Sequence, residues 1–221
     1  MTIRATSYCY TIILFLFVSL HAQGQLAGMF ELGTGTQGKE PLSYDAGISV
    51  GQVLLKSQGY SFVGIKAQKF PLIPPHKLRG SEDNYLGQTM DLWHFSIYCG
   101  LRYSINLFKI KKESDNRFGI FPEARLYFSP LLPREINYSE DNYPNQSNLI
   151  TLKGKSISQW AYGCGGGIYY GNPKVAYLSL KYEMSTIDIF ESLRALDYKN
   201  DTFDTRGYQH IISLSLYVNI N

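Results

Sequence analysis

The chain has 221 residues, of which 44% are hydrophobic, 18% charged and 14% aromatic. This composition excludes a disordered polymer and a bundle of membrane helices, and the length favours one domain. The formal net charge of +3, from 21 basic and 18 acidic residues, is too small to indicate nucleic acid as a partner. The many Tyr, Phe and Gly residues favour strands joined by tight turns, and we interpret the chain as all-β.

The first segment has the features of an export signal. Arg4 precedes a ten-residue apolar run from Thr11 to Leu20, and Ala22 to Gly24 supplies small residues for a signal peptidase. Ten apolar residues are about half of the ~20 that a membrane-spanning helix needs. We therefore expect a signal peptide over residues 1–24 and a single mature domain over residues 25–221.

Alternation of apolar and polar residues recurs eight times after the signal, bounded by Gly, Pro, Asn and charged residues. Alternation with period two predicts strands that have one apolar and one polar face. The eight predicted strands are Gly28 to Gly35, Tyr44 to Leu54, Tyr60 to Gln68, Asp91 to Ile105, Phe118 to Ser129, Ile157 to Tyr170, Val175 to Thr186 and Tyr208 to Ile220.

Eight charges of these windows fall on the polar face. They are four acids and four bases, namely Glu31, Asp45, Lys66, Arg102, Glu123, Arg125, Lys181 and Glu183. The same face carries Gly163, Gly165 and Gly167, and we expect the apolar face to be free of charge. Small residues and balanced charges are typical of the interior of a narrow closed barrel, where buried charges must pair. We predict a lumen filled by a network of these eight charges.

Aromatic residues on the apolar face recur at a fixed spacing. Three pairs lie ten residues apart, namely Trp93 with Tyr103, Phe118 with Phe128, and Trp160 with Tyr170. Ten steps along a tilted strand rise ~25 Å, the height of the apolar band between the aromatic girdles of a membrane barrel. The spacing favours an aromatic girdle at both ends of the wall.

Loop lengths alternate along the chain. The connections after the second, fourth and sixth predicted strands are mostly short, whereas Pro71 to Met90, Pro130 to Ser156 and Ile187 to Gly207 are long. Short turns on one side and long loops on the other, with both termini on the short side, are typical of outer-membrane barrels, whose long loops are extracellular.

With the strands placed, the chain resembles the small bacterial outer-membrane β-barrel proteins, the porin-like and OmpA-like eight-stranded group. The resemblance lies in Leu92 to Ile105, Phe118 to Pro130, Ala161 to Tyr170, Tyr177 to Ile187 and Ile212 to Ile220. The chain departs from this group where Tyr98 or Cys99 replaces a mid-strand Pro, and where it ends on Asn221 rather than an aromatic residue. The resemblance implies a closed antiparallel transmembrane barrel in the outer membrane of a Gram-negative bacterium, inserted by the barrel-insertion machinery.

Candidate chemical sites are few. His94 and Ser96 resemble the His-x-Ser pair of outer-membrane lipid A deacylases, but they share the polar face with Arg102 and so point away from lipid. Cys99 and Cys164 of the mature chain could form one disulfide. No metal-ligand spacing is present, and we predict no catalytic, metal or cofactor site.

We therefore expect a non-enzymatic outer-membrane barrel that serves envelope structure or surface interaction through its long loops. Its expected partners are outer-membrane lipids, the insertion machinery and an unidentified surface ligand of the loops. Three alternatives remain: a narrow pore, a lipid A-modifying enzyme and a soluble lipocalin-like carrier. The carrier lacks the Gly-x-Trp of the first lipocalin strand, and its cavity would have to be lined by the charge-free face.

Overall fold

The computed structural model describes residues 25–37, 42–54, 58–72, 90–110, 115–131, 135–142, 146–153, 157–188 and 207–220. The predicted signal peptide, residues 1–24, lies outside these ranges. No helix within them has the length and apolar character needed to cross a membrane.

Eleven strands form within the described ranges. Their bounds are β1 Leu26–Gln37, β2 Ser43–Leu54, β3 Gly59–Leu72, β4 Met90–Tyr103, β5 Ile105–Lys109, β6 Arg117–Leu131, β7 Glu135–Asn142, β8 Gln146–Lys153, β9 Ile157–Asn172, β10 Ala176–Ser185 and β11 Gln209–Ile220. All eight predicted strands are present, and their bounds differ from the expected ones by a few residues at most.

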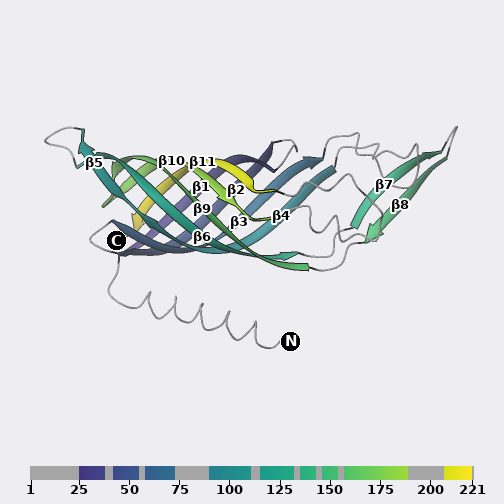
Figure 1. Ribbon diagram of the computed structural model, residues 1–221, viewed down its shortest axis with the longest axis horizontal. Coiled ribbons are helices and arrows are strands. Elements are labelled where there is room, and N and C mark those ends of the chain that lie inside the picture. Colours follow the sequence, from purple (N-terminus) through teal and green to yellow (C-terminus); the bar gives the residue numbers. More distant parts are fainter. Residues whose placement is uncertain are drawn as a thin grey trace, which may run out of the picture.

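The main sheet closes on itself. Its order is β4-β3-β2-β1-β11-β10-β9-β6-β5, and an additional pairing between β4 and β6 joins its two edges (Figure 1). β5 follows β4 after one residue, Ser104, and pairs with the same strand, β6. β4 and β5 thus act as one interrupted strand, and the chain is a closed eight-stranded antiparallel barrel, as predicted.

The two ends of the barrel differ in their connections. At one end, which we call the turn end, Leu54 pairs with Gly59 and Asn172 pairs with Ala176, so the connections there are short. The first and last barrel strands also begin and end there, because Leu26 pairs with Ile220. The opposite end, which we call the loop end, carries the three long connections, after β3, β6 and β10, together with the brief one between Gln37 and Ser43. The predicted division into short turns and long loops is confirmed.

Three predicted boundaries are wrong. β5 occupies part of the connection predicted after the fourth strand, and β3 runs four residues past Gln68. Within the predicted loop Pro130 to Ser156, β7 and β8 form a two-stranded hairpin, in which Ile136 pairs with Leu152. Figure 1 shows this hairpin beyond the loop end of the barrel, far from β5.

Burial alternates along the barrel strands. β11 is the clearest case, since every second residue from Gln209 to Tyr217 is buried while the residues between them are exposed. Ile, Leu and Val on the exposed side suit a pleated strand, and Ser and Tyr fill the other side. The polar face is therefore the interior, and the apolar face is the outer wall.

The outer wall is not wholly free of charge. Because β3 continues past Gln68, it carries Lys69 on the outward side, in register with the exposed Tyr44 and Trp93. The expectation of a charge-free apolar face therefore fails at Lys69, just past the third predicted strand, and at Asp91, the first residue of the fourth, which has the sequence parity of Trp93.

Candidate functional site: the barrel interior

All eight predicted lumen charges lie inside the barrel, and each residue is only 1–7% exposed. Ionised groups lose hydration when they are buried, so each needs compensating partners. Six of them form one group, which we call the charged cluster: Glu31, Arg102, Glu123, Arg125, Lys181 and Glu183. Three carboxylates meet three cations, so the formal charges of the cluster sum to zero.

Glu123 contacts all three cations of the cluster. Its Oε2 accepts a hydrogen bond from Arg102 Nε at 2.6 Å, and its Oε1 accepts from Arg125 Nε at 2.6 Å. Lys181 Nζ donates to the same Oε1 at 3.0 Å. Arg102 and Glu123 face each other directly in the pairing of β4 with β6, so strand register brings this pair together.

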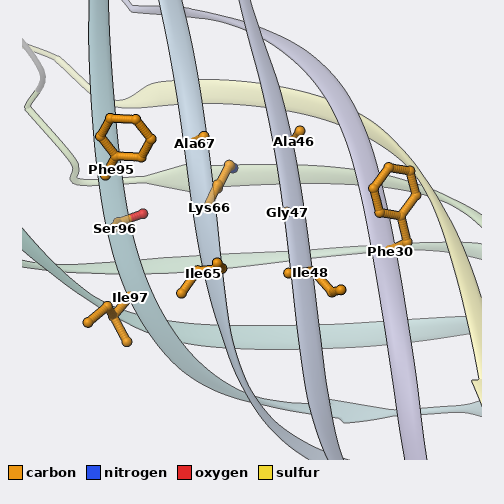
Figure 2. A pocket seen from close by; sticks show the side chains of 10 residues that line it. All are labelled: Phe30, Ala46, Gly47, Ile48, Ile65, Lys66, Ala67, Phe95, Ser96 and Ile97. Carbon is orange, nitrogen blue, oxygen red and sulfur yellow. The ribbon is translucent and has the colours of Figure 1, made fainter.

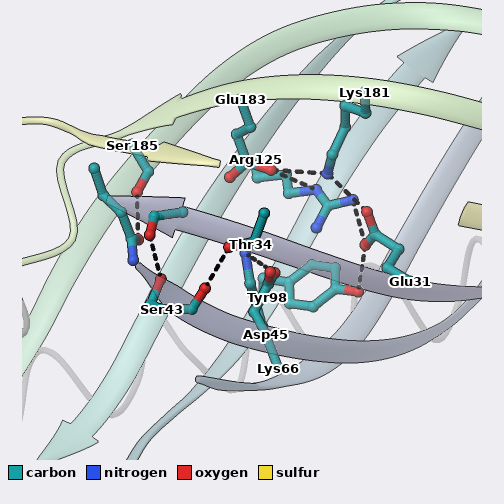
Figure 3. A network of polar contacts seen from close by, with 12 residues as sticks. Glu31, Thr34, Ser43, Asp45, Lys66, Tyr98, Arg125, Lys181, Glu183 and Ser185 are labelled. Atoms are coloured by element: carbon teal, nitrogen blue, oxygen red, sulfur yellow. Dashed lines mark hydrogen bonds and ion pairs between the residues drawn. The ribbon is translucent and has the colours of Figure 1, made fainter. Parts of the chain in front are cut away.

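The other two carboxylates complete the cluster (Figure 3). Glu31 lies 2.6 Å from Arg125 Nη2 and 2.8 Å from Lys181 Nζ, and it accepts a hydrogen bond from Tyr98 at 3.3 Å. Glu183 contacts Lys181 Nζ at 2.8 Å and accepts a hydrogen bond from Tyr127. These contacts join β1, β4, β6 and β10 across the lumen, so the cluster ties opposite walls of the barrel together.

Aromatic rings cover the two guanidinium groups. The Arg102 guanidinium lies 4.1 Å from the centre of the Phe121 ring, and that of Arg125 lies 4.6 Å from the Tyr98 ring. A cation over an aromatic face is attracted by the ring quadrupole, most strongly where water is excluded. The rings therefore compensate part of the hydration that the guanidinium groups lose.

Asp45 and Lys66 form a second, separate ion pair nearer the loop end. Lys66 Nζ lies 2.9 Å from Asp45 Oδ2, and both side chains are 3% exposed. With this pair, all eight predicted lumen charges have an ionic partner.

The glycines of β9 leave space for the charged cluster. Gly165 pairs with Glu123 on one side and with Glu183 on the other. A Cβ on Gly163 would lie 2.7 Å from Glu183 Oε1 and 3.1 Å from the Tyr127 ring. Small residues here let long charged side chains from the neighbouring strands reach across the lumen.

Six buried aromatic side chains close the lumen between the charged cluster and the turn end, and we call them the aromatic layer. They are Tyr60, Phe62, Phe121, Tyr169, Tyr177 and Tyr217. Tyr177 stacks on Tyr217 at 4.4 Å, Tyr217 meets Tyr60 edge-on at 5.2 Å, and Arg102 Nη1 donates to the Tyr177 hydroxyl at 3.3 Å. The sequence pattern of charges alone did not identify this layer.

Smaller polar side chains fill the interior on the other side of the cluster. We call them the loop-end layer: Gln37, Ser43, Gln68, His94, Ser96, Ser129, Ser185 and Gln209. Ile187, fully buried, lies just beyond β10 at this end. His94 and Ser96 are 1% and 2% exposed inside the barrel, so neither reaches the outer wall, where a lipid-attacking pair would have to lie.

The structure places the six predicted girdle residues on the outer wall. Trp93, Tyr103, Trp160 and Tyr170 are exposed, and Phe118 and Phe128 are half-buried. Phe128 pairs with Trp160 at the loop-end side of β6, and Phe118 pairs with Tyr170 at its turn-end side. The predicted spacing therefore places aromatic pairs near both ends of the wall.

Other candidate sites contribute little. No disulfide joins Cys99 and Cys164, which lie on β4 and β9 with β6 between them. Among the described residues, no group of three or more His, Cys, Asp or Glu side chains is arranged to hold a metal ion.

No family model matches the chain, and no curated protein matches it. Several solved structures are similar in fold. The N-terminal β-barrel domain of Pseudomonas aeruginosa OprF has a TM-score of 0.39 at 9% identity, covering 90% of this chain and 100% of that one. A major outer membrane protein from Thermus thermophilus has a TM-score of 0.41 at 10% identity, covering 88% and 99%.

A third similar structure is Ail, the attachment invasion locus protein of Yersinia pestis, in complex with the heparin analogue sucrose octasulfate. It has a TM-score of 0.30 at 11% identity and covers 89% of this chain and 95% of that one. The first of these solved structures is a β-barrel domain and the second a major outer membrane protein. Similarity at this level concerns the fold alone, so function must be argued from the residues of this chain.

Proposed function

We propose that the protein is a non-enzymatic outer-membrane β-barrel of a Gram-negative bacterium, which serves envelope structure or surface interaction and does not conduct. One observation carries the proposal: the barrel is inverted relative to a soluble protein. Large apolar side chains form its exposed wall, and charged and polar side chains fill its buried interior. An exposed apolar wall of this extent requires an apolar surrounding, which a lipid bilayer supplies.

The interior supports a plug rather than a pore. An eight-stranded barrel has an interior just wide enough for its own side chains. Here the charged cluster crosses the lumen and the aromatic layer closes it towards the turn end. An ion would have to displace both groups of buried side chains in order to pass.

The interior and the wall also disfavour the other two alternatives. A soluble carrier of the lipocalin type would present a polar wall and an apolar cavity, the reverse of this arrangement. A lipid-modifying enzyme would need its nucleophile and base on the wall, whereas Ser96 and His94 are buried inside. The remaining place for function is the loop end.

The hairpin of β7 and β8 gives that end a defined surface element. It extends beyond the barrel on the side opposite the short turns (Figure 1). We place the loop end outside the cell, where the hairpin and its neighbouring connections would contact a surface ligand. Outer-membrane lipids and the insertion machinery are the partners that the wall requires.

A substitution on the wall tests membrane insertion. Leu214 is 55% exposed and lies in a row between Leu32 and Leu180. Leu214→Arg should destabilise the inserted barrel by ~2 to 4 kcal/mol, because the charge would face the bilayer midplane. Leu214→Phe, which stays apolar, is the matched control and should behave as wild type. The measurements are outer-membrane fractionation and heat-modifiable gel migration. Equal insertion of the Arg variant would overturn the membrane assignment.

Conductance separates plug from pore. The purified barrel in a planar bilayer should show no reproducible single-channel steps, because paired charges and rings fill the lumen. Stable steps whose ion selectivity changes in Arg125→Glu would establish a pore instead, since Arg125 lies at the centre of the lumen.

A further inference from the structure

The outer wall is hollowed between β1 and β4. The hollow has a volume of about 410 Å³ and is lined by outward-facing apolar side chains of four neighbouring strands. Figure 2 shows Phe30 and Phe95 on its two sides, with Ala46 and Ala67 between them. The volume lies in the usual range for sites that bind small molecules.

Strand register explains why the wall is hollow here. Ala46 pairs with Ala67, and this alanine pair lies between Leu32 on β1 and Phe95 on β4. The next row towards the turn end is made of bulkier residues, with Ile48 paired with Ile65. Two methyl groups side by side between larger neighbours leave a depression, which we call the apolar hollow.

A cation lies directly above the apolar hollow on the loop-end side. Lys69 is two residues from Ala67 on the same face of β3, about 7 Å along the strand. Its Nζ lies 5.8 Å from the centre of the Trp93 ring, and the exposed Tyr44 is its partner in register on β2. Lys and aromatic residues together mark the level where a bilayer meets its headgroups.

We propose that the apolar hollow binds one acyl chain of an anionic lipid, whose phosphate contacts Lys69. The inference rests on the proposed membrane location and adds a specific lipid site to it. The chain would lie over Ala46 and Ala67 between Phe30 and Phe95, while the phosphate meets the ammonium group of Lys69 at the rim. No covalent step is involved.

The shape and charge of the site favour a lipid over a second copy of the protein. The wall of a closed narrow barrel is convex, and the convex wall of another copy would rest on Phe30 and Phe95 without filling the space between them. A flexible alkyl chain can enter that space. A cation at the loop-end rim of an apolar hollow matches the layout of an anionic lipid, with its charge at one end of its chains.

Lipid retention tests the inference. The barrel is reconstituted with either dipalmitoyl phosphatidylglycerol or dipalmitoyl phosphatidylcholine. Native mass spectrometry then counts the lipids that stay bound after the barrel leaves its membrane. Wild type should retain one phosphatidylglycerol, about fivefold more often than phosphatidylcholine, because one Lys near the surface contributes ~1 kcal/mol. Ala67→Leu should abolish the retention by filling the hollow, and Lys69→Gln should remove only the preference for phosphatidylglycerol.

The control is Ala124→Leu, the same substitution at an exposed wall position on β6 outside the hollow, which should retain lipid as wild type does. Ala46→Leu provides a second filling variant if Ala67→Leu does not fold. Equal retention by the filled variants and the control would overturn the site. A dimeric wild type that becomes monomeric in Ala67→Leu, with lipid retention unchanged, would also overturn the lipid site and assign the hollow to a second copy. Heat-modifiable migration of each variant reports separately whether the barrel folds in the membrane. A failure of the proposed membrane function can therefore be distinguished from a failure of the lipid site.

Discussion

The charged cluster and the loop-end layer both lie inside the same barrel, yet they satisfy their polar groups very differently. In the cluster, Glu123 alone receives hydrogen bonds from three cations at 2.6 to 3.0 Å. In the loop-end layer, some side chains are bonded, as Ser185 is to Gln209 at 3.2 Å. The side-chain hydroxyls of Ser96 and Ser129 and the amide of Gln68, however, have no hydrogen-bond partner among the described residues. Burial is similar in the two regions, so it does not account for the difference.

The difference follows from what each group loses on burial. An ionised side chain that is buried without partners costs several kcal/mol, whereas a buried hydroxyl costs far less. The charged cluster therefore depends on an exact strand register, and the uncharged loop-end layer does not. We infer that the cluster specifies how the walls fit together, and that the loop-end layer mainly fills space. The predictions that follow test this division.

The largest effect is expected at Glu123. Glu123→Ala leaves Arg102, Arg125 and Lys181 buried with one carboxylate fewer, and should lower the free energy of unfolding by ~3 to 5 kcal/mol. Urea unfolding in detergent micelles, followed by heat-modifiable migration, measures the loss. The matched control is Ser129→Ala on the same strand, which should cost ~0.5 kcal/mol or less. Similar costs at both positions would show that the two regions do not differ.

Exchanging the two charges of an ion pair compares the Asp45–Lys66 pair with the charged cluster. Within the described part of the chain, Asp45 and Lys66 have no third ionic partner within 4 Å, so the double variant Asp45→Lys with Lys66→Asp should recover ~2 to 3 kcal/mol of the losses of the single variants. The same exchange between Arg102 and Glu123 should recover less than ~1 kcal/mol, because the new cation at position 123 would meet Arg125 and Lys181. A double-mutant cycle in urea measures both couplings. Equal recovery by the two exchanges would mean that the cluster is a set of independent pairs.

Much of this interior could be predicted from the sequence, because parity along a strand determines which face a residue occupies. Glu31 and Glu183 were assigned to the lumen in this way, although they lie far apart in the chain. Their partners could not be predicted. The contacts of Arg125 with Glu31 and of Lys181 with Glu123 depend on register and shear around the closed sheet, and alternation within one strand carries no information about either.

Other features were readable but missed. Tyr60 and Phe62 share the parity of Lys66, so the aromatic layer could have been found by treating inward aromatic residues like inward charges. The outward Lys69 was not predicted because the predicted strand ends at Gln68, four residues before the end of β3. In the hairpin, pairing between β7 and β8 places Tyr138 opposite Ile150 within a segment whose Asn, Asp and Pro content favoured a loop.

The smallest expected difference comes from removing a single hydroxyl in each region. Tyr98 donates to Glu31 at 3.3 Å within the charged cluster, and hydrogen bonds to charged groups contribute ~1.5 to 3 kcal/mol. Because this bond is long, Tyr98→Phe should cost ~1.5 kcal/mol, at the lower end of that range. Ser96→Ala removes a buried hydroxyl whose oxygen has no hydrogen-bond partner among the described residues, so it should leave the free energy of unfolding unchanged within ~0.5 kcal/mol. Tyr98 and Ser96 both point inward from β4 and lie two residues apart, so the two variants are matched in strand and nearly matched in burial. Parallel urea titrations of the two variants compare them directly. A loss at Ser96→Ala as large as that at Tyr98→Phe would show that the loop-end layer is a bonded network in its own right, and the proposed division of the interior would fail.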